Sequence, residues 1–207
     1  MSAAVKICGV TRIEDALTAA RCGAHAIGLV FYRRSPRYVE PDAAAAIVRA
    51  LPPFVTPVGL FVDAAPDEVI TVAARTRVQL LQFHGSETPQ FCAQFDLPYM
   101  KAVQVRPGVD LLQYGRDFHG AKALLLDAFL DGLHGGTGAV FDWSLIPPSL
   151  PLPVVLSGGL SPENVGEAIH RVRPFAVDVS SGVEASKGIK DPAKIAAFIS
   201  GVRNADV

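Results

Sequence analysis

The sequence has few of the features that define disulfide-rich or metal-binding proteins. It contains only three cysteines, Cys8, Cys22 and Cys92, an odd number without dense spacing. A disulfide framework is therefore not expected, and the reducing cytoplasm is the expected location. No Cys-x-x-Cys or His-x-x-x-His pair occurs, so the sequence predicts no metal site.

The sequence also lacks a large excess of positive or negative charge, and it lacks long apolar runs. The formal net charge is -1, and the one basic cluster, residues 33–37, is too short to follow a nucleic-acid backbone. No uninterrupted apolar stretch is long enough to cross a bilayer, and residues 1–4 lead into a strand pattern without a visible signal sequence. We therefore expect neither a nucleic-acid partner nor a membrane partner.

Hydrophobic residues make up 50% of the 207 positions, which is enough for one sizeable core, and we expect a single domain over residues 1–207. Eight short segments are rich in β-branched residues or leucine and mostly lack clean polar alternation. This composition is typical of strands that are buried on both faces. The predicted strands cover residues 5–10, 26–31, 55–62, 78–84, 99–105, 121–128, 153–160 and 176–180.

Helical patterns separate the predicted strands. Residues 11–14, Thr-Arg-Ile-Glu, match a capping box at the start of the first helix. Between strands six and seven the pattern is weak, and residues 141–146 predict a short helix at most. The longest irregular stretch, residues 130–152, is expected to form an active-site loop. Four prolines have positions typical of a first helical turn: Pro66, Pro89, Pro162 and Pro192.

Eight strands alternating with helices are compatible with a closed parallel barrel or with an open doubly wound sheet. An open sheet that binds nucleotides usually has a glycine-rich first turn, whereas residues 8–11 here are Cys-Gly-Val-Thr. The glycine-rich turns instead follow strands six, seven and eight, where barrels bind phosphate. We therefore predict an α/β fold, a single-domain (β/α)8 TIM barrel with eight parallel strands.

Two groups suited to proton transfer lie at the ends of predicted strands. Side chains alternate along a strand, so Cys8 points into the barrel if Ile7 faces the helices. The same alternation points Asp127 inward from strand six. Both residues then lie at the carboxyl-terminal mouth, where barrel active sites are built, and strands one and six are nearly opposite. We predict a thiol base and a carboxyl acid that face each other across this mouth.

Each of these two residues also has a simpler interpretation. An isolated free cysteine is most often a small buried hydrophobe, and an aspartate often caps a helix or forms an ion pair. The simpler interpretation is weaker for Asp127, because an ionised carboxylate at the end of an aliphatic strand is rarely buried without a purpose.

A second pair of charged residues is predicted inside the barrel. Lys6 and Asp178 face inward by the same alternation, from strands one and eight, which are neighbours in a closed ring. We predict a contact between them, and we include Asp178 among the substrate-binding residues. The charge of Lys6, two residues from Cys8, favours the thiolate form of the cysteine.

Three glycine turns, at residues 135–138, 157–160 and 180–183, follow the last three strands. Glycine allows backbone N–H groups to approach an anion closely, and a helix that begins just after the turn favours negative charge. A single such turn is weak evidence, because glycine is common in turns. Two of them after the last two strands favour a phosphate site. The predicted phosphate-binding residues are Gly136, Gly158, Gly159, Ser181 and Gly182.

Two further polar residues follow predicted strands. Arg37 comes after strand two, and a guanidinium can bind a carboxylate through two hydrogen bonds. Without other evidence, the simpler interpretation is a solvated surface arginine. His84 ends strand four and can titrate near neutrality, although a structural histidine with satisfied hydrogen bonds is the simpler interpretation.

Several short motifs occur in a distinctive order along the chain. They are Lys-Ile-Cys-Gly at 6–9, Ser-Pro-Arg at 35–37, Gln-Phe-His-Gly at 82–85, Leu-Asp at 126–127, and the glycine-containing motifs at 135–138, 157–160 and 178–184. Together they resemble phosphoribosylanthranilate isomerase over essentially the whole chain. One departure is Phe83, where that family more often has leucine.

The resemblance implies an Amadori rearrangement in tryptophan biosynthesis. The aminoaldose N-(5-phosphoribosyl)anthranilate becomes 1-(2-carboxyphenylamino)-1-deoxyribulose 5-phosphate. The resemblance further implies Cys8 as the general base, Asp127 as the general acid and Arg37 as the residue that holds the anthranilate carboxylate. No cofactor or metal is expected, because the reaction moves protons only. We expect a small phosphorylated substrate and a monomer.

Three other functions remain open at this point. A Schiff-base lyase or aldolase would need a lysine at the barrel mouth, and Lys6 lies a layer deeper than Cys8. A sister sugar isomerase of histidine synthesis resembles a two-aspartate pair, where this chain has Cys8. A phosphate-binding barrel without catalytic activity would keep the glycine turns but would have no need for an acid and a base that face each other.

Overall fold

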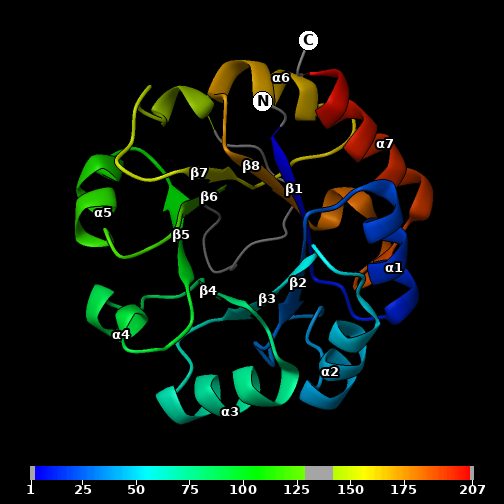
Figure 1. Cartoon of the computed structure of the whole chain (residues 1–207). Helices are drawn as coiled ribbons and strands as arrows, with labels where there is room; N and C mark the ends of the chain where they lie inside the picture. The colour runs from blue at the N-terminus through cyan, green and yellow to red at the C-terminus, as the bar shows by residue number, and fades with distance from the viewer. Residues whose placement is uncertain (1–2, 129–141, 206–207) are drawn as a thin grey trace.

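The computed structural model describes residues 3–128 and 142–205, and within them eight parallel strands close into a barrel in the order β1 to β8. Figure 1 shows these strands as an inner ring with the helices packed around it. The ring closes between β1 and β8, where Lys6 lies opposite Asp178. The predicted (β/α)8 barrel is therefore confirmed, and the open doubly wound sheet is excluded.

The strands occupy the central part of the segments predicted for them. Several predicted ends form turns instead: residues 157–160, for example, leave the barrel as a glycine turn with two positive φ angles. The strands are β1 (Ala4–Cys8), β2 (Ala26–Val30), β3 (Thr56–Phe61), β4 (Leu80–Phe83), β5 (Tyr99–Val105), β6 (Leu124–Ala128), β7 (Val154–Leu156) and β8 (Ala176–Val179).

The helices that cover the barrel are mostly short. They are α1 (Ile13–Cys22), α2 (Pro41–Ala50), α3 (Pro66–Thr76), α4 (Pro89–Ala93), α5 (Leu111–Asp117), α6 (Val165–Val172) and α7 (Pro192–Asn204). Pro66, Pro89 and Pro192 occupy first-turn positions as predicted. The prediction for Pro162 is wrong, because α6 begins only at Val165.

The capping box predicted for residues 11–14 does not form. Helix α1 begins at Ile13, and its N-cap residue, Arg12, accepts no hydrogen bond through its side chain. The Thr11 hydroxyl donates instead to the carbonyl oxygen of Gly188, at 2.6 Å. A distant segment therefore uses the hydroxyl that the sequence pattern assigned to the helix.

Between β6 and β7 the described residues contain only a short 3-10 helix, η1 (Trp143–Leu145). This agrees with the weak helix expected at 141–146, of which residue 141 lies outside the described residues. The expected active-site loop at 130–152 is described only from residue 142 onward.

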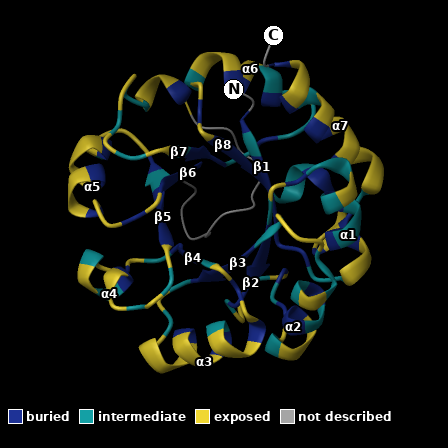
Figure 2. Cartoon of the chain, in the orientation of Figure 1, coloured by how far each residue is buried: buried dark blue, intermediate teal, exposed yellow. Residues whose placement is uncertain are grey.

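Two hydrophobic layers hold the barrel together. The outer layer lies between the strands and the helices, and Figure 2 shows the strand ring buried while the helices expose their outer faces. The inner layer fills the part of the barrel interior below the cavity that contains Cys8. It consists of Val58, Met100, Ala102, Ala123, Leu125, Val155 and Ala176. No helix in the described part of the chain is long and apolar enough to cross a membrane.

A small hairpin follows β8 and was not predicted from the sequence. After the 3-10 helix η2 (Ser181–Val183), the strands β9 (Glu184–Ser186) and β10 (Ile189–Lys190) pair antiparallel. Glu184 lies opposite Lys190 in this pairing. The hairpin lies outside the barrel ring and brings both side chains to the predicted site.

Candidate active site

One cavity at the carboxyl ends of the strands contains most of the predicted functional side chains. Cys8 enters it from β1 and Asp127 from β6, and the strands β7 and β8 separate these two walls in the ring. The geometry predicted from strand alternation is therefore present. The polar residues that line the cavity are Cys8, Tyr32, Ser35, Arg37, Gln82, His84, Asp127, Ser157, Asp178 and Ser180.

The Cys8 thiol lies against the backbone of the neighbouring strand. Cys8 pairs with Gly28 of β2, and a Cβ atom at position 28 would lie only 2.7 Å from Sγ of Cys8 and 3.1 Å from Nζ of Lys6. Real Cβ contacts are essentially never shorter than 3.0 Å. Glycine at position 28 therefore makes room for both the thiol and the ammonium group.

Lys6 forms the predicted ion pair with Asp178. Its Nζ donates to Oδ1 of Asp178 at 2.7 Å, and the Ser157 hydroxyl donates to Oδ2 at 3.3 Å. Both members of the ion pair are buried. Asp178 also lines the cavity, so the structure places it where a substrate-binding residue is expected, but with a buried lysine as its partner.

The ionisation of Cys8 differs from the sequence-based expectation. Burial raises the pKa of the Cys8 thiol above its ordinary value, while the charge and hydrogen bond of Lys6 act in the opposite direction. The expectation that Lys6 favours the thiolate gives the correct sign for its own effect, but the desolvation caused by burial is larger. Burial likewise disfavours the charged form of Lys6, yet Asp178 and Cys8 together outweigh it and raise the pKa of the lysine.

Asp127 is held by two hydrogen bonds. Its Oδ1 accepts from the backbone N–H of Ala128 at 2.9 Å, and its Oδ2 lies 3.1 Å from Nε2 of His84. A Cβ atom on Gly158, the residue with a φ of +81° after β7, would collide with the Ala128 nitrogen and approach Oδ1 to 2.9 Å. Glycine at this turn therefore makes room for the carboxyl group.

His84 links Asp127 to a buried glutamine. Its Nδ1 lies 2.9 Å from Nε2 of Gln82, so both ring nitrogens have partners, as expected of a structural histidine. The partner on one side, however, is the predicted acid. Gln82 Oε1 has no partner among the described residues, and a half turn of the amide would present this oxygen to Nδ1. The three residues can thus accommodate either tautomer of the imidazole.

Arg37 is buried at the cavity, so its interpretation as a solvated surface arginine is wrong. Its Nε and Nη2 donate to Oε1 and Oε2 of Glu184 at 2.7 and 2.8 Å. Burial disfavours the charged Glu184 carboxylate, but the hydrogen bonds and charges of Arg37 and Lys190 together outweigh it and hold the pKa of Glu184 below its ordinary value.

The predicted phosphate turns after β7 and β8 lie side by side. A Cβ atom on Gly182 would overlap the carbonyl oxygen of Leu160, so the two turns are in backbone contact. Gly158 and Gly159 both have positive φ angles, and Ser181 opens η2. The third predicted turn, with Gly136, lies outside the described residues.

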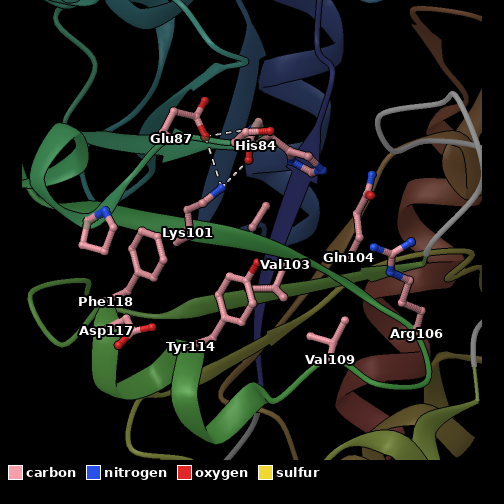
Figure 3. Close-up of a pocket in the computed structure, with 14 residues that line it drawn as sticks. His84, Glu87, Lys101, Val103, Gln104, Arg106, Val109, Tyr114, Asp117 and Phe118 are labelled. Atoms are coloured by element: carbon pink, nitrogen blue, oxygen red, sulfur yellow. Dashed lines mark hydrogen bonds and ion pairs between the residues drawn. The ribbon is translucent and has the colours of Figure 1, made fainter.

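A larger cavity, of about 560 Å³, lies beside β5 and α5. Figure 3 shows that Lys101 and Glu87 face each other in it, with Tyr114 and Phe118 of the α5 region on another side. Lys101 Nζ donates to Glu87 at 3.1 Å and to the carbonyl oxygen of Gly85 at 2.6 Å. Neither the thiol nor the carboxyl of the predicted pair lines this cavity, so it does not compete as the site of acid-base chemistry.

Comparison with known proteins identifies the family of the chain. The family model for N-(5'phosphoribosyl)anthranilate (PRA) isomerase matches residues 5–201. The chain belongs to this family. It is 60% identical over 205 residues to the N-(5'-phosphoribosyl)anthranilate isomerase of Nitrosospira multiformis, with 98% of this chain and 97% of the relative covered.

Solved members of the PRA isomerase family have the same barrel. The phosphoribosyl anthranilate isomerase of Thermotoga maritima superposes with a TM-score of 0.89 at 43% identity, covering 98% of this chain and 99% of that one. A second structure, at 42% identity with a TM-score of 0.86, covers 98% and 99% of the two chains. It is a complex with reduced 1-(o-carboxyphenylamino)-1-deoxyribulose 5-phosphate.

Sequence reasoning predicted the partner of Asp178 but missed the partners of Asp127 and Arg37 in this PRA isomerase family member. Strand alternation points Gln82 of β4 and His84, the residue after this strand, to the same side, which was a usable signal for a connected pair. The pairing of Arg37 with Glu184 had no such signal, because 147 residues separate them and the hairpin that carries Glu184 was not predicted.

Proposed function

We propose that this chain catalyses the Amadori rearrangement of N-(5-phosphoribosyl)anthranilate to 1-(2-carboxyphenylamino)-1-deoxyribulose 5-phosphate, the isomerisation of tryptophan biosynthesis for which its family is named. One observation carries the proposal: a thiol and a carboxyl group, from β1 and β6, line the same cavity, and Arg37 lines it with them. This set supplies a base, an acid and a carboxylate-binding group.

In the proposed mechanism, protonated Asp127 donates its proton to the furanose ring oxygen, which opens the ring and leaves a Schiff base at C1. The Cys8 thiolate then removes the proton from C2. The resulting enolamine is protonated at C1 while its C2 hydroxyl loses a proton, which gives the ketone. Protons lost and gained balance over the cycle, so the reaction needs no redox partner. General acid-base catalysis of this kind contributes on the order of 10² to 10⁴ in rate for each group.

The proposed roles of the other residues follow the charges of the substrate. Arg37 holds the anthranilate carboxylate, and Asp178 supports substrate binding from β8. The backbone N–H groups of the turns with Gly158, Gly159, Ser181 and Gly182 hold the phosphate, because N–H groups at such turns favour an anion. The phosphorylated ligand in the complex of the 42% identical relative supports a site for such a ligand. Gly136 keeps its predicted phosphate role only as a proposal from the sequence.

A Schiff-base lyase is the second candidate, and the cavity disfavours it. No lysine lines the cavity in the described part of the chain, while Lys6 is buried in its ion pair with Asp178. A lyase of this type needs an amine that can attack a carbonyl group. Borohydride treatment in the presence of substrate should therefore trap no covalent adduct.

The decisive experiment is turnover of phosphoribosylanthranilate by the purified protein, followed by the loss of anthranilate fluorescence. We expect turnover without added metal or cofactor. Binding of the substrate without turnover would instead identify a phosphate-binding barrel and defeat the proposal.

The carboxylate role of Arg37 has a test of its own. We expect Arg37→Ala to raise KM strongly, because the substrate carboxylate loses its charged partner. An unchanged KM in this variant would remove Arg37 from the binding site.

We also propose that residues 1–207 act as one catalytic domain and that one chain suffices for activity. The cavity with Cys8, Asp127 and Arg37 is formed by one chain. The specific activity should therefore stay constant on dilution through the range in which any oligomer dissociates, as measured by sedimentation at the same concentrations. The cytoplasmic location remains a prediction.

A further inference from the structure

A buried cluster of charges links the cavity to the hairpin of β9 and β10. Arg37 and Lys190 both bind Glu184, the former through two hydrogen bonds and the latter through Nζ at 2.9 Å from Oε1. The Lys190 side chain is fully buried, and the Glu184 side chain is 6% exposed. Such groups are rarely buried without a role in structure or function.

The contacts of Glu184 fix its carboxylate from several sides. In addition to the two cations, the backbone N–H of Gly188 donates to Oε1 at 3.3 Å. Lys194 Nζ donates to the main-chain oxygen of Glu184 at 2.8 Å, which ties β9 to α7. The carboxylate therefore has little freedom to move, and it holds the Arg37 guanidinium along one edge.

Lys190 is itself held in place by its surroundings. Its Nζ donates to the carbonyl oxygen of Ser180 at 3.1 Å, and its backbone N–H donates to Oδ2 of Asp15 at 3.1 Å. Asp15 is in turn bound by Arg12, through hydrogen bonds of 2.7 and 3.0 Å. The cluster thus rests on α1 and on the end of β8.

The cluster combines two cationic side chains, Arg37 and Lys190, with one anionic side chain, Glu184. A planar guanidinium presents five N–H donors, and Glu184 takes two of them on one edge. Two hydrogen bonds to one carboxylate constrain the plane of the guanidinium. Arg37 lines the cavity together with Cys8 and Ser180.

We propose that Glu184, held by Lys190, is a positioning residue that aims the Arg37 guanidinium at the carboxylate of the anthranilate ring. This inference rests on the proposed function. Lys190 holds the Glu184 carboxylate that fixes one edge of the Arg37 guanidinium. Glu184 thereby contributes to the preference for an aryl group that carries a carboxylate, without touching the substrate.

The test compares two ligands that differ only in that carboxylate. They are reduced 1-(2-carboxyphenylamino)-1-deoxyribulose 5-phosphate and the same molecule with an unsubstituted phenyl ring. We expect the wild-type protein to bind the carboxylated ligand more tightly by titration calorimetry. Glu184→Gln should reduce the ratio of the two Kd values roughly 10- to 100-fold, because Arg37 loses its fixed plane.

The kinetic signature separates positioning from a general structural role. In Glu184→Gln, KM for phosphoribosylanthranilate should rise while kcat changes much less, and the Kd of the carboxylate-free ligand should stay as in the wild type. In an Arg37→Ala background, Glu184→Gln should have no further effect on the ratio. Glu167→Gln is the matched control, because its partner Arg171 lies on the exposed surface of α6.

Glu184→Asp covers the case in which the glutamine variant does not fold. It keeps the charge but withdraws the carboxylate by one methylene group, and it should lower the Kd ratio in the same direction. An unchanged ratio in a folded variant would overturn the inference. A higher ratio would also overturn it, because Glu184 would then compete with the ligand for Arg37. Absence of wild-type turnover, by contrast, defeats the proposed function, whatever the ratio.

Discussion

The two walls of the cavity place a reactive group in the same way but surround it differently. Cys8 and Asp127 both lie near the end of a strand, and a neighbouring glycine makes room for each. Charges surround the thiol, namely the ion pair of Lys6 and Asp178. An imidazole, His84, and a peptide N–H surround the carboxyl group.

The difference follows from the two tasks. A base is useful as an anion, and a nearby ammonium group stabilises that anion. An acid must exist with and without its proton, and an imidazole can accept a hydrogen bond from the first form or donate one to the second. The comparison teaches that the chemical role of a strand-end side chain is set by the groups packed around it, from its own strand and from other parts of the barrel.

The largest effects are expected from changing the two reactive groups themselves. Cys8→Ser and Asp127→Asn should each lower kcat by on the order of 10² to 10⁴, because each removes one proton-transfer group. The Kd of the reduced product analogue should change little. Turnover assays measure kcat, and calorimetry measures the Kd.

Cys22→Ser, a half-buried cysteine at the end of α1, is the matched control and should keep full activity. Normal turnover of either site variant would show that the proposed pair does not carry the reaction.

Substitution of the glycines that make room for Cys8 and Asp127 should have the next largest effect. Gly28→Ala and Gly158→Ala should lower kcat roughly 10- to 100-fold, because the new methyl group displaces the thiol or the carboxyl from its position. At Gly158 the left-handed backbone adds a loss of stability of about 1–2 kcal/mol. Turnover and thermal unfolding separate the two effects.

Gly108→Ala is the control for the left-handed backbone. Gly108 has a φ of +88° and no atom within 4 Å of a built Cβ, so its variant should lose stability but keep kcat. If Gly28→Ala keeps wild-type turnover, the thiol tolerates displacement and the close packing has no catalytic meaning.

Lys6 should influence the pH dependence of kcat/KM through its effect on the Cys8 thiol. Because burial raises the pKa of Cys8, the thiolate fraction and kcat/KM should increase as pH rises from neutrality. Lys6→Met removes the cation that opposes this shift, so the pKa of Cys8 should rise further and the rising limb should move to higher pH. The measurement is the pH profile of kcat/KM.

The double variant Lys6→Met with Asp178→Asn avoids leaving an unpaired buried carboxylate, which would cost about 3–5 kcal/mol. Lys101→Met is the control, since Lys101 is also buried and paired with a carboxylate, but outside the cavity. Because Asp178 by itself raises the pKa of Cys8, the rising limb should move less in the double variant than in Lys6→Met. A limb that stays in place in a folded Lys6→Met variant would mean that Lys6 does not act on the thiol.

A smaller effect on kcat is expected from changing His84, the partner of Asp127. His84→Asn should lower kcat about tenfold, at the low end for loss of a hydrogen bond to a charged group. Binding of the product analogue should be unaffected, because the phosphate and carboxylate contacts remain. Single-turnover measurements isolate the rate of the chemical step from product release.

His170→Asn, at an exposed histidine of α6, is the matched control variant. A loss in His84→Asn as large as that in Asp127→Asn would contradict the difference between the two walls, since His84 would then be indispensable.

The closed barrel and the positions of Cys8 and Asp127 were predictable because they depend on local rules. Buried strands have a recognisable composition, and alternation along a strand fixes which side chains point inward. The contact between Lys6 and Asp178 follows from the same rule once the ring closes. The choice of a closed barrel over an open sheet also used the late positions of the glycine-rich turns.

The predictions that failed concern polar groups with distant partners. Thr11 matched a capping pattern, yet its hydroxyl bonds to Gly188, and Arg37 resembled a surface residue, yet it is buried against Glu184. The strength of a hydrogen bond or ion pair depends on which partner lies within reach, and that is decided by how remote segments pack.

The sequence by itself therefore determined the strand order, the inward faces and the reactive groups at the mouth of this barrel, because backbone periodicity is a local property. Only the tertiary structure decided the partners of those groups and the rise in the pKa of Cys8. Burial outweighs the nearby charge of Lys6, and this burial exists only once the ring has closed.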